Sequence, residues 1–230
     1  MAMNPVERRL AYICSEWLVF RDDPRRRLLV WDTPDNARRL VRAFFESQKH
    51  ETEYSSGDLF LVFDVPFRHA IQYSRDLKAA LAGQYSASLT ELAQQGEATD
   101  WAYDPVAAPD SPEGFIAGVR SFGSKYAERI GTLAVVLALE SVADMEAFGR
   151  WLLRALDTGL PRRLRLVTLD SRESPGLIGL AGGDDPRIAW RSLQVDGFDV
   201  AQETFAQEPT VGPAGVFRNQ LMGLLALAEK

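Results

Sequence analysis

The chain has 230 residues, of which 46% are hydrophobic and 25% are charged, and its formal net charge is −6. A chain of this length and composition is typical of a globular protein that buries its core without cross-links. The single cysteine, Cys14, excludes an internal disulfide framework and any zinc or iron–sulfur site built from several cysteines. With two histidines, the chain has too few for a histidine-rich metal centre.

The basic residues do not form the clustered footprint that is typical of nucleic-acid binding. The densest basic run, residues 25–27, follows Asp22 and Asp23 and is interpreted as the solvated start of a strand. No run approaches the 18 apolar residues that span a membrane, and residues 1–9 lack the apolar centre of a signal peptide. We therefore expect a cytoplasmic protein that binds neither nucleic acid nor membrane.

The first predicted element is a helix within residues 1–22. Asn4 caps free N–H groups and Pro5 needs no N–H at the first helical position. Residues 27–31 are a short apolar run that suits a buried strand, and Thr33-Pro34 predicts the start of a second helix.

A second strand is predicted over residues 59–65, because the run is continuously apolar. Pro66 is expected to start a helix whose inward face includes Phe67 and Ile71. Gly83 is expected to interrupt this helix, so that a shorter helix follows over residues 88–95.

Residues 96–114 contain three prolines and predict a long loop, which precedes an amphipathic helix over residues 115–130. The strongest strand signal in the chain lies over residues 133–139. After it, Ser141 and Asp144 form a capping-box pattern that predicts the next helix. The remaining predicted elements are a strand over 164–169, a glycine-rich loop over 176–183, a strand over 188–195, a short helix over 198–205 and a last helix over 216–228.

Helical and apolar-strand patterns alternate along the chain, and four strands are apolar on both faces. This pattern is typical of a parallel sheet with helices on each side. We predict a single α/β domain, doubly wound, with a mostly parallel sheet of about five strands in residues 25–195. A C-terminal helix is expected within residues 213–230, and the lack of a stop signal before Lys230 suggests the N-terminal part of a longer protein.

An acid ends each of the first four predicted strands: Asp32, Asp64, Glu140 and Asp170. Ligands in open α/β sheets bind at this edge, so the four carboxylates are candidates to hold Mg²⁺. The other interpretation is that each acid caps the free N–H groups of the following helix. The acid-x-Pro pattern at residues 32–34 and again at 64–66 favours capping.

No phosphate-binding loop follows the first strand. Residues 32–36 contain neither glycine nor lysine, and their acids would repel a triphosphate. Residues 118–125 come nearest to the motif, but the last two are in the wrong order and lie in a predicted helix. The glycines of residues 176–183 predict a flexible loop, from which Arg172 or Arg187 would reach a ligand. His69 opens the helix after the second strand and is a candidate general base beside the acids.

Residues 25–195 resemble, in layout, the core of P-loop NTPases of the AAA+ and STAND type. Residues 28–31 take the place of the strand before the phosphate loop, and residues 133–139 followed by Glu140 are similar to a Walker B strand. Residues 164–170 are similar to the sensor-bearing strand that comes next. The resemblance implies a degenerate member of the class without nucleotide hydrolysis, because the phosphate loop is absent.

Two functions follow from these patterns. The first is a non-catalytic protein-binding or adaptor domain without a cofactor, for which Trp101 and Tyr103 on the long loop are the expected contacts with a protein partner. The other reading of these aromatics is that they fold back and fill a gap in the domain. The second function is a Mg²⁺-dependent enzyme that acts on a phosphorylated substrate through the four acids and His69.

Overall fold

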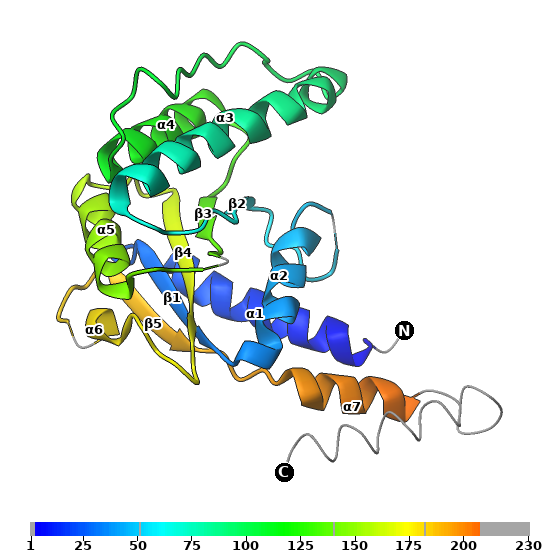
Figure 1. Ribbon diagram of the computed structural model, residues 1–230. Helices are drawn as coiled ribbons and strands as arrows, with labels where there is room; N and C mark the ends of the chain where they lie inside the picture. Colours follow the sequence, from blue (N-terminus) through cyan, green and yellow to red (C-terminus); the bar gives the residue numbers. More distant parts are fainter. Residues whose placement is uncertain (1–2, 51, 140, 182, 208–230) are drawn as a thin grey trace.

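The computed structural model describes residues 3–50, 52–139, 141–181 and 183–207. Within these residues the chain forms one sheet of five parallel strands with helices on both faces (Figure 1). The strand order is β2-β3-β4-β1-β5. The doubly wound α/β fold is therefore confirmed. The strands are β1 (Leu28–Thr33), β2 (Leu59–Phe63), β3 (Leu133–Leu137), β4 (Leu164–Ser171) and β5 (Ile188–Ser192).

The helices divide between the two faces of the sheet. Helices α1, α2 and α7 lie on one face and α3, α4 and α5 on the other, with a 3-10 turn, η1, leading into α2 (Figure 1). None of the described helices is long and apolar enough to cross a membrane. The bounds are α1 (Pro5–Asp22), η1 (Asp35–Ala37), α2 (Arg38–Ser47), α3 (Ala70–Gln94), α4 (Pro112–Lys125), α5 (Met145–Asp157), α6 (Ile178–Ala181) and α7 (Gly197–Gln207).

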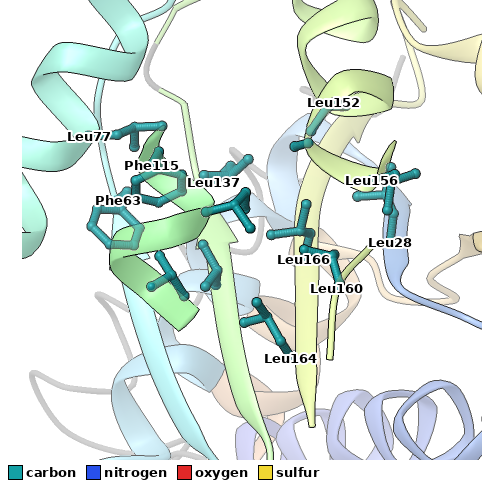
Figure 2. Packing of buried hydrophobic residues seen from close by; sticks show 14 of the residues in the cluster. Leu28, Phe63, Leu77, Phe115, Leu137, Leu152, Leu156, Leu160, Leu164 and Leu166 are labelled. Carbon is teal, nitrogen blue, oxygen red and sulfur yellow. The ribbon is translucent and has the colours of Figure 1, made fainter. Parts of the chain in front are cut away.

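Alternate residues of the central strands enter two separate cores. On β3, Leu133 packs toward α3, α4 and α5, whereas Ala134 packs toward α1 and α2. Figure 2 shows the first core, in which leucines of α5 lie on the same side of the sheet as Leu28 and Leu166. Fully burying one such leucine contributes about 1.5–3 kcal/mol, so strands apolar on both faces hold a helical layer on each side.

The second core is aromatic. Trp31 of β1 stacks on Phe45 of α2, with ring centroids 5.9 Å apart, and Phe60 of β2 contacts Trp17 of α1 at 4.9 Å. Cys14 is also buried on this face, as a core residue. Helix α1 begins as predicted, because Asn4 and Glu7 form a reciprocal capping box.

Helix α3 differs from the sequence prediction in where it begins and in being continuous. It begins at Ala70 rather than at Pro66, and it runs unbroken through Gly83 to Gln94. A glycine in a helix costs only about 1 kcal/mol, which the packing of a long helix outweighs. Phe67 lies before the helix and is buried, as expected, whereas Ile71 is 61% exposed and does not face the core.

Further boundaries also differ from prediction, and several strands end two or three residues earlier than predicted. Asp144 alone is the N-cap of α5, because its side chain accepts from the Ala147 N–H, and Ser141 lies outside the helix. Helix α4 ends at Lys125, and the glycine-rich segment contains the short helix α6. The helix predicted over residues 216–228 lies outside the described residues.

Candidate functional site

The carboxyl ends of β1 and β4 form the crevice in which open α/β sheets bind ligands. The chain leaves β1 through η1 and α2 on one face of the sheet. It leaves β4 toward α6, whose neighbour Leu177 is buried in the core of the other face. Adjacent strands whose connections leave toward opposite faces define the switch point of a doubly wound sheet.

Arg172, directly after β4, bridges the strand ends at this edge. Its Nη2 donates to the backbone oxygens of Asp32 at 3.1 Å and Leu193 at 2.7 Å and to Ser192 Oγ at 2.8 Å. Ser192 Oγ in turn donates to Asp32 Oδ2 at 2.7 Å. One guanidinium thereby joins the ends of β1, β4 and β5. Both Asp32 and Arg172 form hydrogen bonds within the chain. These charge-assisted bonds hold the strand ends together.

A backbone N–H after β1 already donates to a carboxylate of the chain. The Asp35 N–H donates to Glu173 Oε2 at 3.0 Å, so a carboxylate of the chain lies where a phosphate loop would present its N–H groups. Pro34 supplies no N–H, and the Ala37 N–H donates to the Pro34 carbonyl oxygen at 2.9 Å. A triphosphate at this position would be repelled by the negative charges of Asp32, Asp35 and Glu173.

Among the strand-end acids that the structure describes, Asp170 is the most buried, at 1% exposure. Its carboxylate accepts from the N–H groups of Ser171, Gly176 and Leu177 at 2.9 to 3.1 Å. It therefore holds the turn between β4 and α6. The donors all precede α6, which begins at Ile178, so Asp170 binds the turn and not the free N–H groups of a helix.

Asp64 lies at the far edge of the sheet. It follows β2, which β3 and β4 separate from β1, and it pairs with Arg42 of α2 at 3.0 Å on the surface. It does not cap a helix. Glu140 lies outside the described residues. Among the residues that the structure places, no group of three or more histidine, cysteine or acidic side chains is arranged to hold a metal ion. The strand order thus keeps Asp64 away from Asp32 and Asp170, and these three acids do not converge as the Mg²⁺ hypothesis requires.

His69 has a structural partner. Its Nδ1 accepts from the Gln72 N–H at 3.2 Å, which makes it the N-cap of α3. The nearest match to a phosphate loop, residues 118–125, lies in α4. There Gly118 allows the Tyr103 ring to approach, since a Cβ at this position would lie 2.6 Å from the ring.

The long loop folds back onto α3 and α4. Trp101 is 7% exposed, stacks on Tyr103 at 5.1 Å and donates from Nε1 to Ser121 Oγ at 3.1 Å. Further along, the buried Lys78 of α3 holds the loop through Asp110 at 2.9 Å. The aromatics therefore fill a gap in the domain, and the structure does not present them as exposed contacts for a partner.

No model of a known protein family matches the chain, and no curated protein matches it either. The inference of function therefore rests on the site alone.

Local sequence patterns do not reveal how Arg172, Glu173 and Ser192 act together. They predict a flexible loop from which Arg172 or Arg187 reaches a ligand, whereas Arg187 is paired with Asp185 at 2.7 Å and Asp157 at 2.9 Å. The contacts of Arg172 depend on β1 lying between β4 and β5. No local sequence pattern predicts that arrangement.

The packing of the long loop predicts alkaline sensitivity. Burial, and then the charge of Asp104, raises the pKa of Tyr103 to about 12. An unfolded tyrosine ionises near pH 10, so between about pH 10 and 12 the unfolded state binds fewer protons. The free energy of unfolding is therefore expected to fall with rising pH, by at most about 1.4 kcal/mol per pH unit from this residue. Denaturant unfolding at each pH measures it.

Tyr103→Phe is the matching variant, because the Tyr103 hydroxyl is buried and has no hydrogen-bond partner among the described residues. Tyr103→Phe is expected to make the alkaline slope shallower and to leave stability at pH 7 unchanged or raised. Burial also raises the pKa values of Tyr73 and Tyr126, so part of the slope remains in the variant. Burial and the charges of Arg27 and Arg162 lower the pKa of Arg165 to about 10, which opposes the fall equally in both proteins. An identical slope in Tyr103→Phe and the unmutated protein would contradict the assignment.

Proposed function

We propose that the chain is a non-catalytic protein-binding or adaptor domain on a degenerate nucleotide-binding-like α/β scaffold. One observation carries the proposal. At the edge where such a sheet binds its ligand, Arg172 is hydrogen-bonded to the ends of β1 and β5. The backbone N–H that opens η1 has the Glu173 carboxylate as its acceptor.

The arrangement of the strands supports a degenerate relationship to P-loop NTPases of the AAA+ and STAND type. The three strands that carry the resemblance, β3, β4 and β1, lie side by side in this order. In such an NTPase the phosphate loop would follow β1, and in this chain Pro34 and η1 follow it instead. Fold alone does not determine function, so the proposal depends on how this edge is filled.

Thermal unfolding of the full chain with ATP, GTP and Mg²⁺, separately and together, tests the proposal. The midpoint is expected not to move. A ligand present at 100 times its dissociation constant adds about 2.7 kcal/mol, which is roughly 5–11 °C for a chain of this size. A shift of this size with nucleotide would contradict the proposal. A shift with Mg²⁺ alone would favour the enzyme that uses the strand-end acids.

A further inference from the structure

An apolar cavity of about 220 Å³ lies at the opposite edge of the sheet, where β3 and β4 begin. Its lining includes Val119 and Gly123 of α4, Leu133 of β3 and Leu164 of β4. Leu164 is labelled in Figure 2 at the start of β4. Gly123 keeps this space open, since a Cβ there would already lie 3.2 Å from Leu133. The cavity thus has a floor of apolar side chains from three elements.

Three arginines lie around this cavity: Arg120, Arg162 and Arg163. All three are exposed, and within the described part of the chain none of them has a carboxylate partner. Arg120 donates to the backbone oxygens of Thr158 and Gly159, and Arg163 donates to that of Ala127. Their charges therefore remain available to an anion that approaches from solvent.

A fourth arginine, Arg165, lies on the other face of β4, where its guanidinium is 5.9 Å from the centre of the Phe20 ring. Arg165 is 3% exposed and donates to backbone oxygens, among them that of Arg21 at 2.8 Å, rather than to a carboxylate. Burial and the charges of Arg27 and Arg162 lower its pKa to about 10. Nearby Asp58 is engaged by Arg21 at 3.3 Å. The charges of Asp23 and Asp58 act on the pKa of Arg165 in the opposite direction, so Arg165 is partly compensated. The exposed positive charge at the cavity is that of the three rim arginines.

We propose that this arginine-rimmed cavity binds an acidic segment of a partner protein, which inserts an apolar side chain between α4 and the start of β4. The proposal rests on the adaptor function and names its binding surface. Pockets that enclose a drug-sized molecule measure about 300–1,000 Å³, so this cavity suits one or two side chains of a peptide. Carboxylates on either side of the inserted residue then meet the three guanidinium groups, whose forked donors match carboxylate geometry.

The charge complementarity sets specificity, and the buried apolar contact supplies affinity. Arginines at a rim steer acidic partners and select against basic ones. An apolar side chain in a desolvated pocket is the usual centre of such an interface. Phosphate backbones carry the same charge as an acidic peptide, but they have no apolar group for the floor that Val119, Leu133 and Leu164 form.

Fluorescence anisotropy of three labelled peptides with the full chain tests the proposal. The probe is Asp-Glu-Leu-Leu-Glu-Asp, and the controls are Lys-Lys-Leu-Leu-Lys-Lys and Asp-Glu-Ser-Ser-Glu-Asp. The acidic peptide with leucines is expected to bind at least about tenfold more tightly than either control. Equal binding of the three peptides, or tighter binding of a single-stranded oligonucleotide, would overturn the proposal.

Two variants locate the binding site. Arg120→Glu combined with Arg162→Glu reverses the rim, and Ala127→Trp fills the cavity from an exposed position. Each is expected to weaken the acidic peptide at least about tenfold. Arg39→Glu, an exposed arginine of α2, is the matched control and is expected to leave binding unchanged. Thermal unfolding confirms that each variant is folded.

The outcomes separate this proposal from the proposed function. Binding of the acidic peptide that survives both cavity variants would overturn the cavity as the site and leave the adaptor function in place. Lack of peptide binding, with no shift of the unfolding midpoint by nucleotide, would likewise overturn only the cavity. A nucleotide-induced shift would overturn the proposed function itself.

Discussion

Asp170→Ala is expected to destabilise the protein by about 3 kcal/mol or more, because it leaves buried N–H groups without their charged acceptor. The carboxylate accepts from Ser171, Gly176 and Leu177, which ties the end of β4 to the turn before α6. For a chain of this size the unfolding midpoint should fall by roughly 6–12 °C. Differential scanning calorimetry measures both quantities.

Asp64→Ala is the matched control, since Asp64 also follows a strand but is exposed and makes only a surface ion pair with Arg42. Its effect is expected to lie within about 1 kcal/mol. Similar losses from Asp170→Ala and Asp64→Ala would contradict a structural role for the Asp170 carboxylate. A rise of the unfolding midpoint with Mg²⁺ in the unmutated protein that Asp170→Ala abolishes would also contradict it.

Trp101→Ala is expected to lower the free energy of unfolding by about 3 kcal/mol, near the lower end for a buried tryptophan, because a loop relaxes more readily than a core strand. The variant removes the stack on Tyr103, the hydrogen bond to Ser121 and the edge contact with Phe122 at 5.3 Å. Chemical denaturation with tyrosine and tryptophan fluorescence reports the change.

Val106→Ala supplies the control for Trp101→Ala within the same loop. Val106 is 90% exposed, so its truncation is expected to change stability by less than about 0.5 kcal/mol. If Trp101→Ala leaves stability intact but abolishes binding of the acidic peptide, Trp101 is a contact residue after all, and the gap-filling role is wrong.

Local patterns in the sequence predict the succession of strands and helices. The apolar run around β3 and the capping residues before α1 act over a few residues, and both are found where the sequence places them. Gly83 and Ser141 are also local signals, but their predictions are wrong. Packing of α3 overrides the glycine, and Asp144 supplies the cap in place of the serine.

The candidate sites depend on which strands become neighbours, and this is not encoded locally. Asp32 and Asp170 are in register on β1 and β4, yet one is engaged by Arg172 and Ser192 and the other by backbone N–H groups. An acid at each strand end therefore predicts a shared site only if the acids also lack partners within the fold. The cavity between α4 and β4 is likewise formed by segments that are distant in sequence.

Hydrogen exchange of the full chain with the acidic leucine peptide, and separately with ATP and Mg²⁺, distinguishes a peptide site from a nucleotide site. We propose that this domain binds a protein segment at the arginine-rimmed cavity and no nucleotide at the carboxyl edge of the sheet. We expect slower exchange over residues 119–133 and 160–166 with the peptide, and unchanged exchange over residues 32–37 and 170–177 with nucleotide. Protection of residues 32–37 by nucleotide, with no effect of the peptide at the cavity, would contradict this proposal.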